Sequence, residues 1–174
     1  LYNRREATRL LEEELQRASR YRRSMALLWI DFDHFKDIND TYGHAAGDLV
    51  LRSVTRLLAE SVRTVDIVGR FGGEEFVVIL PEMDARGAAE TAERLRQRVS
   101  EHRCILGSGV VIPLTVSIGV AVYPDHGDQA DRLFASADRA MYQAKSQGRN
   151  CVVVAPGSHA SRRPKPSQGA GFGP

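Results

Sequence analysis

Residues 25–31 form a continuous apolar run that ends in an acid, Met25-Ala26-Leu27-Leu28-Trp29-Ile30-Asp31. A run without polar residues on either face is typical of a strand buried on both sides at the centre of a sheet. Ligands bind to open α/β sheets at the carboxyl ends of their strands, which is where Asp31 would lie. Asp33 follows two residues later and shares a face with Asp31 if the strand continues. This stretch therefore predicts the middle of the fold and one side of a candidate site.

Helical and strand patterns alternate on either side of this run. Apolar periodicity predicts helices over 3–20, 34–41, 45–62, 85–100 and 128–146. Runs of β-branched and apolar residues predict further strands at 66–71, 75–80, 114–122 and 151–154, with a shorter strand near 104–112. Gly72-Gly73 separates two of these runs and indicates a hairpin. The order predicts an α/β (α+β) domain with a mixed central sheet flanked by helices.

Length and composition favour one globular domain. The chain has 174 residues, of which 43% are hydrophobic and 26% charged, and its formal net charge of +2 gives no basic field that favours nucleic acid. No apolar run approaches the ~18 residues of a transmembrane helix, so we expect no membrane insertion by this domain and a cytoplasmic location. Cys104 and Cys151 lack metal-ligand spacing and are expected to be reduced thiols.

The sequence at each end of the chain gives a prediction about what lies outside the folded domain. The chain begins with Leu1 rather than Met, which favours a piece of a longer protein, whose remaining part could anchor it to a membrane. From Ala155 the sequence turns to Pro, Gly and Ser. Such a composition predicts a disordered tail over 155–174 and leaves 1–154 as the domain.

A second cluster of acids stands in the predicted hairpin, Gly72-Gly73-Glu74-Glu75-Phe76. Glycines let a backbone come close to a phosphate, and paired carboxylates bind a hard cation such as Mg²⁺. Two metals held by shared carboxylates neutralise a triphosphate and align its attacking and leaving oxygens. The two clusters together thus favour phosphoryl or nucleotidyl transfer. Each cluster alone is equally compatible with an acidic strand end or an ordinary turn.

Five motifs resemble one known family. Residues 70–76, Arg-Phe-Gly-Gly-Glu-Glu-Phe, resemble the signature of the GGDEF-domain diguanylate cyclases in its GGEEF form, with Glu74 in place of the Asp of the family name. The stretch from Asp31 to His44, followed by Gly47-Asp48, is similar to the second strong motif of the family. Further matches lie at 117–121, at 137–145 and at 148–150. The resemblance covers about 1–154 and implies a fold similar to the palm of adenylyl cyclases and some polymerases, with a ferredoxin-like sheet.

The resemblance also implies a reaction and its cofactors. Two domains face each other as a homodimer, and each holds one GTP. Each 3′-hydroxyl attacks the α-phosphate of the other GTP, so that cyclic di-GMP forms and pyrophosphate leaves. Two Mg²⁺ (or Mn²⁺) ions per site would be held by Asp31, the carbonyl of Phe32, Glu74 and Glu75. Glu74 is also the candidate base, unless a metal itself lowers the pKa of the hydroxyl.

Further residues are implied as substrate ligands. Asn39 and Asp48 would read guanine, whose adjacent N1–H and N2–H₂ donors suit a carboxylate. His44 lies four residues before Asp48 and could face the same pocket, or it is a structural histidine at a helix start. The phosphates would meet main-chain amides and basic side chains. The residues implied here are Phe35, Lys36, Gly72, Gly73, Lys145 and Arg149, although Lys145 is also compatible with a solvated lysine at a helix end.

A third group of residues, 63–66 together with Arg94, implies regulation. Arg63-Thr64-Val65-Asp66 lies just before Gly72-Gly73, where many family members carry an RxxD site for inhibition by the product, cyclic di-GMP. Arginine pairs with O6 and N7 of guanine, and Asp66 would accept from the N1–H edge. Arg94 resembles the second arginine of that site. The alternative is a helix-terminal arginine and a strand-start aspartate. Leu1-Tyr2-Asn3-Arg4 resembles the end of a motif that leads into an upstream regulatory domain.

Two other classes of function remain open from the sequence. One is a non-catalytic sensor module that binds GTP or cyclic di-GMP, and the other is a ferredoxin-like interaction domain without a nucleotide. Degenerate family members typically lose the metal acids or the glycines, and this chain keeps both. An interaction domain would leave the paired acids and glycines unexplained.

Overall fold

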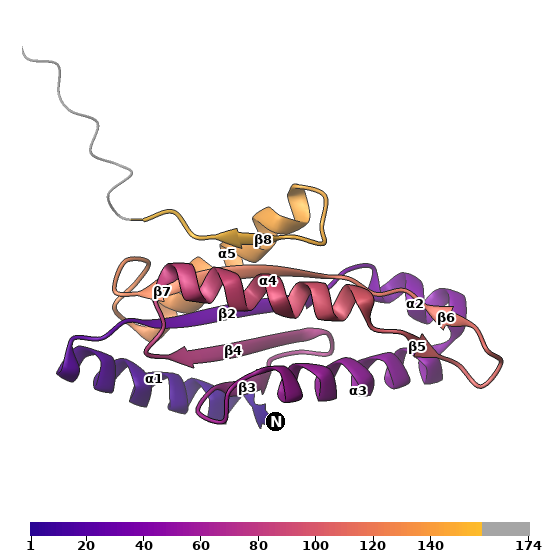
Figure 1. Ribbon diagram of the computed structural model, residues 1–174, viewed down its shortest axis with the longest axis horizontal. Coiled ribbons are helices and arrows are strands. Elements are labelled where there is room, and N and C mark those ends of the chain that lie inside the picture. Colours follow the sequence, from indigo (N-terminus) through magenta and orange to yellow (C-terminus); the bar gives the residue numbers. More distant parts are fainter. Residues whose placement is uncertain (158–174) are drawn as a thin grey trace, which may run out of the picture.

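The computed structural model describes residues 1–157 and contains a central six-stranded sheet with helices on both faces (Figure 1). The strand order in this sheet is β1-β3-β4-β2-β7-β8. Its strands are β1 (Tyr2–Asn3), β2 (Met25–Phe32), β3 (Ile67–Arg70), β4 (Glu75–Pro81), β7 (Val116–Tyr123) and β8 (Val152–Val154). The helices are α1 (Arg4–Tyr21), α2 (Phe35–Tyr42), α3 (His44–Ser61), α4 (Ala85–Glu101) and α5 (Ala130–Ser146). A separate pair, β5 (Cys104–Ile105) and β6 (Val111–Ile112), forms a small hairpin.

Strand β2 lies at the centre, as its apolar run predicts. All eight of its residues are buried, and it pairs antiparallel with both β4 and β7. The outer pairs β1–β3 and β7–β8 are parallel. The predicted mixed central sheet flanked by helices is therefore confirmed, and so is the hairpin at Gly72-Gly73, because β3 and β4 pair antiparallel across it.

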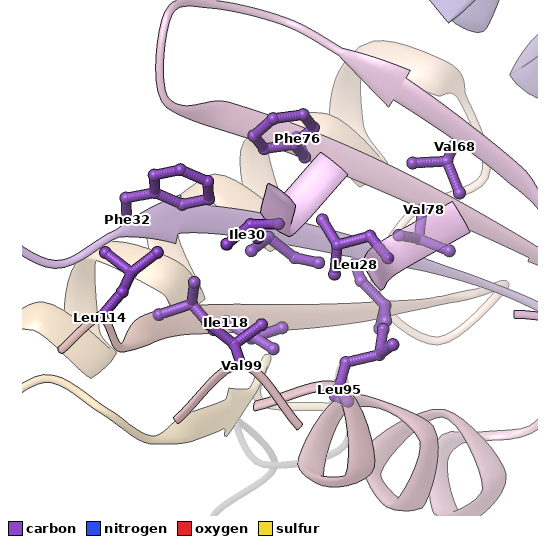
Figure 2. Packing of buried hydrophobic residues seen from close by; sticks show 14 of the residues in the cluster. Leu28, Ile30, Phe32, Val68, Phe76, Val78, Leu95, Val99, Leu114 and Ile118 are labelled. Atoms are coloured by element: carbon purple, nitrogen blue, oxygen red, sulfur yellow. The ribbon is translucent and has the colours of Figure 1, made fainter. Parts of the chain in front are cut away.

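The two faces of the sheet carry separate hydrophobic layers. Even-numbered residues of β2, such as Leu28 and Ile30, pack in one core with α3 and α4, and Figure 2 shows them beside Leu95 and Val99 of α4. Odd-numbered residues of β2, such as Leu27, pack in the other core with α1 and α5. Because side chains alternate along a strand, Asp31 continues the face that α5 covers.

Helix α5 lies unusually close to the sheet. A Cβ atom at Gly119 of β7 would overlap the carbonyl oxygen of Ala137 and the amide nitrogen of Met141, both on α5. Glycine is required there because only a residue without a side chain lets the two backbones approach so closely. The contact fixes the height of α5 above the sheet, and the last turn of α5 carries Lys145.

The structure differs from the sequence prediction in details at the edges. Strand β1 was not predicted; it is an edge strand that immediately precedes α1. The predicted helix over 3–20 begins at Arg4, because Asn3 caps it through a capping box with Glu6. The single strand predicted near 104–112 is the short β5–β6 hairpin instead, since a turn with a left-handed Gly109 interrupts it.

The chain stays packed against the sheet at Ala155, the first residue of the predicted tail. Ala155 is buried, and its N–H donates to the carbonyl of Val120 at 2.8 Å, which continues the β7–β8 pairing. The rest of the predicted tail from residue 158 lies outside the described residues. Within residues 1–157, no helix has the length and apolar character that a membrane crossing requires.

Candidate active site

The two acidic clusters meet at one end of the sheet. Asp31 and Glu75 lie directly opposite each other in the β2–β4 pair, and the N–H of Phe32 donates to the carbonyl of Glu74 at 3.2 Å. The turn before Glu75 is held by Arg70, whose guanidinium donates to the carbonyls of Gly72 and Gly73 at 3.0 Å each. The strand register thus joins two motifs that lie more than forty residues apart in the sequence.

A cleft of about 840 Å³ opens beside these acids. Most of the predicted metal and phosphate residues line it, namely Asp31, Phe32, Phe35, Lys36, Glu74, Glu75, Lys145 and Arg149. It is also lined by residues for which the sequence predicted no role: His34, Asp37, Asp138, Met141, Tyr142 and Ser146. Acids from β2 and from the β3–β4 hairpin and bases from α2 and from the end of α5 and the turn after it therefore line a single opening.

Lys145 lies between the acids of the β2 end. Its ammonium donates to the carbonyl of Phe32 at 2.8 Å and lies 2.9 Å from Asp31 Oδ1 and 3.0 Å from Asp33 Oδ1. The resemblance implied a phosphate ligand for Lys145. In this structure the side chain is bound to Asp33 and to two oxygens that the same resemblance assigns to metal, those of Asp31 and Phe32.

Asp33 is the buried anchor of this arrangement. Its oxygens accept from Ser117 Oγ and Thr115 Oγ1 at 2.7 Å each, from the N–H of Asn150 at 3.0 Å and from Lys145. Burial alone would raise the pKa of Asp33, but the hydrogen bonds from Ser117, Thr115, Lys145 and Asn150 outweigh it, so the pKa lies below its ordinary value. The sequence placed Asp33 in the acidic cluster without a role, because its partners follow it by eighty residues or more.

The pKa values of Glu74 and Glu75 are raised, whereas that of Asp33 is lowered. Burial raises the pKa of Glu74, and the nearby charge of Asp31 raises it further, while Lys145 acts against this. The pKa of Glu75 is raised by burial, then by the charges of Asp31 and Asp138 and by a hydrogen bond to Asp31. These carboxylates crowd one another, and a site that crowds acids in this way favours an added cation.

The donor set suits a hard divalent cation. Carboxylate and carbonyl oxygens are the ligands that Mg²⁺ prefers, and Asp31 and Phe32 already hold one cation, the ammonium of Lys145. Within the described part of the chain, no three His, Cys, Asp or Glu side chains are grouped around a common metal position. The oxygens are thus organised around the lysine, with Glu74 and Glu75 beside it.

The predicted guanine residues lie beyond the cleft rather than in it. A Cβ atom at Gly47 would overlap the side-chain amide of Asn39 and would lie 3.5 Å from Cζ of Phe35, which lines the cleft. Asn39 therefore packs against the residue before Asp48. Asp48 and His44 are exposed on α3 and do not line the cleft, and neither do Gly72 and Gly73, which border a separate hollow with Leu1, Tyr2 and Asn3.

The predicted inhibitory residues lie at the end of α3 and on α4. The backbone N–H and the guanidinium of Arg63 donate hydrogen bonds to the carboxylate of Asp66 at 2.7–3.2 Å. The guanidinium also donates to the carbonyl of Pro81. Arg94 is exposed on α4. Arg98, one helical turn later, donates to Ser61 Oγ at 2.7 Å, so this face of α4 lies toward the end of α3.

Comparisons with known proteins agree on one family. The family model described as "Diguanylate cyclase, GGDEF domain" matches residues 1–151. Diguanylate cyclase DosC of Escherichia coli is 41% identical over 154 residues, and the response regulator PleD of Caulobacter vibrioides is 44% identical over 154 residues. Both alignments cover 88% of this chain but only 33% and 34% of the relatives, so the chain spans about a third of their length.

Solved structures show the same fold. The GGDEF domain of YfiN (TpbB) from Pseudomonas aeruginosa superposes with a TM-score of 0.87 at 36% identity, covering 90% of this chain and 97% of that one. The GGDEF domain of DgcB from Caulobacter crescentus, solved in complex with c-di-GMP, gives a TM-score of 0.84 at 33% identity, covering 88% of each chain.

Proposed function

Since the chain belongs to the GGDEF family, we propose that it is a diguanylate cyclase domain that condenses two GTP molecules into cyclic di-GMP and releases pyrophosphate. The observation that carries this proposal is the register of β2 against β4, which puts Asp31 opposite Glu75 beside a cleft that Lys145 and Arg149 also line. A triphosphate needs this pairing of oxygen ligands for cations with basic groups for its own oxygens.

The chain's own residues would bind and orient the substrate. Lys36 and Arg149 line the cleft and would pair with phosphate oxygens. Asn39 and Asp48 would read the guanine edge, with Phe35 between them and the phosphates. An acceptor site of this kind disfavours adenine, which lacks the two adjacent donors. His44 begins α3 and would lie near the same base.

Glu74 would accept the proton of the attacking 3′-hydroxyl. Burial and the charge of Asp31 raise the pKa of Glu74, whereas a bound cation would lower it; the alternative is that the metal itself lowers the pKa of the hydroxyl. Two Mg²⁺ or Mn²⁺ ions, held by Asp31, the Phe32 carbonyl, Glu74 and Glu75, would supply charge neutralisation and alignment of the reacting oxygens.

Catalysis would need two copies of the domain. Each copy would hold one GTP, and each GTP would be attacked by the hydroxyl held in the other copy, so we propose a homodimer as the active form. Turnover per domain should then rise with protein concentration. A rate per domain that is independent of concentration down to nanomolar protein would contradict this requirement. We also propose that an upstream regulatory domain controls the pairing, because Leu1-Tyr2-Asn3-Arg4 resembles the end of the motif that leads into such a domain.

Product inhibition is proposed at Arg63, Asp66 and Arg94. In this structure Arg63 and Asp66 satisfy each other, so cyclic di-GMP would have to replace their contact with pairs to guanine. Arg63→Ala should make turnover insensitive to added cyclic di-GMP and leave the initial rate unchanged. Inhibition at the same product concentration in this variant would remove the assignment.

The direct test is incubation with GTP and Mg²⁺, followed by chromatography for cyclic di-GMP. We expect product from the native chain and at least a hundredfold less from Glu74→Gln, because a positioned base contributes typically 10²–10⁴-fold. Glu90→Gln, at an exposed position of α4, is the matched control and should match the native rate. Binding of GTP without product would favour a non-catalytic sensor module, and no binding of GTP would favour an interaction domain.

A further inference from the structure

We infer that Lys145 and a divalent cation compete for the same two oxygens, Asp31 Oδ1 and the carbonyl of Phe32. Metal binding therefore requires the ammonium to leave, and an incoming polyphosphate draws it away. Lys145 thereby couples metal binding to nucleotide binding. The inference rests on the proposed function, because the divalent cation comes from that proposal.

Each N–H donor of the Lys145 ammonium has an acceptor oxygen. A lysine has three N–H donors, and three oxygens surround this one at 2.8–3.0 Å: the Phe32 carbonyl, Asp31 Oδ1 and Asp33 Oδ1. An ion that used the first two oxygens would lie against the ammonium. Two cations side by side in a site where Lys145 is only 18% exposed repel strongly, so the two cannot share these oxygens.

If the side chain of Lys145 moved away, Asp33 would remain held by hydrogen bonds. Asp33 keeps three other donors, Ser117 Oγ, Thr115 Oγ1 and the N–H of Asn150. Asp31 would exchange one cation for another. Asp33 thus stays hydrogen-bonded when the ammonium moves, and the incoming cation at Asp31 replaces the positive charge beside this network.

The direction of movement follows from the other bases. Lys145 lies in the last turn of α5 on a flexible four-carbon stem, and Lys36 and Arg149 line the same cleft. A polyphosphate held by these bases would add negative charge within reach of the ammonium. Because coupling between two ligands is reciprocal, a polyphosphate would tighten metal binding by the same factor as the metal tightens polyphosphate binding.

The first experiment measures binding of Mn²⁺ alone by electron paramagnetic resonance of free Mn²⁺. Lys145→Met should bind Mn²⁺ about tenfold or more tightly than the native chain, since a unit charge is removed next to the ligand oxygens. Arg149→Met removes the same charge from the same cleft, but Arg149 has no ion pair with Asp31 among the described residues. It should change the affinity by less than about threefold.

The two variants separate competition from general electrostatics. Equal gains in Lys145→Met and Arg149→Met, or no gain in either, would overturn the inference and leave the proposed function standing. Failure of Mn²⁺ to bind to any of the three chains would overturn both. Asp31→Asn should abolish the binding that Lys145→Met strengthens.

The second experiment uses the native chain and does not depend on the folding of a variant. An amine-acylating reagent is applied with and without Mg²⁺, and labelling of each lysine is measured by peptide mass spectrometry. Labelling of Lys145 should rise several-fold with Mg²⁺, over the concentration range in which the metal binds. Lys36, exposed in the same cleft, is the internal control and should change little. Constant labelling of Lys145 at saturating Mg²⁺ would refute the competition.

Discussion

The replacement Asp33→Asn should destabilise the domain strongly, although it changes one atom. Oδ1 of Asp33 accepts from Ser117 and Lys145, and Oδ2 accepts from Thr115 and the N–H of Asn150. An amide must turn its NH₂ group toward one of these pairs. The hydroxyl in that pair can rotate and accept, but neither the ammonium of Lys145 nor the N–H of Asn150 can accept a hydrogen bond.

The magnitude follows from this geometry. In either orientation one hydrogen bond is lost and a donor faces a donor, in a side chain that is 1% exposed. Removal of one partner from a buried charged contact costs about 3–5 kcal/mol. For a domain of this size each kcal/mol lowers Tm by about 2–4 °C, so we expect a fall of about 6–20 °C.

The assay is urea and thermal unfolding followed by circular dichroism, with two-state behaviour checked by a second probe. Asp37→Asn is the matched control, because Asp37 lines the same cleft but its side chain is 72% exposed. It should stay within about 0.5 kcal/mol of the native chain. An Asp33→Asn variant as stable as this control would show that the four contacts do not anchor the site.

Three further changes test other parts of the molecule. Gly47→Ala should displace Asn39, raise KM for GTP about tenfold and reduce discrimination against ATP in steady-state assays; an unchanged preference would contradict the guanine assignment. Gly119→Ala should cost about 2–3 kcal/mol in urea unfolding, because its Cβ meets helix backbone; Gly107→Ala, in open space, is the control and should be neutral. Burial lowers the pKa of His126, whose Nδ1 accepts from the N–H of Val122. Since the folded chain then holds this proton less tightly than the unfolded chain, stability is full above the ordinary value of 6.5 and falls as the pH drops through the lowered pKa. His126→Asn keeps an acceptor that does not titrate, so its stability should fall less between pH 7 and 5, as measured by urea unfolding.

The elements that the sequence predicted well are those encoded by local pattern. Strand β2 is a run without polar residues, and Gly72-Gly73 stands between two apolar runs, so both follow from neighbours along the chain. The acids at the β2 end and in the hairpin were predicted to meet because each cluster suits a cation, and the register confirms that they adjoin. The pattern Asn3 to Glu6 also carried a capping signal that would have corrected the start of α1.

The features that the sequence did not predict depend on distant contacts. Asp33 is anchored by Thr115, Ser117 and Asn150, and no local pattern indicates which of several acids receives such donors. The place of Lys145 depends on how α5 is set over the sheet, which follows from the close approach at Gly119. The β5–β6 hairpin could not be separated from one longer strand, because its exposed Ile105 and Val111 give the same apolar signal as buried residues.

The placement of the acids also has a cost that the fold must offset. Like charges directly opposite each other in an antiparallel pair are destabilising, and Asp31 stands opposite Glu75. The apolar pairs Ile30–Phe76 and Trp29–Val77 next to them are buried and hold the register despite this repulsion. Sites that break a local rule of stability are typically functional, because the stable alternative lacks the required chemistry. The ammonium of Lys145 relieves part of the repulsion through Asp31, and a divalent cation would relieve more. The same crowding that weakens the strand pair is therefore what makes one cation replaceable by another at this position.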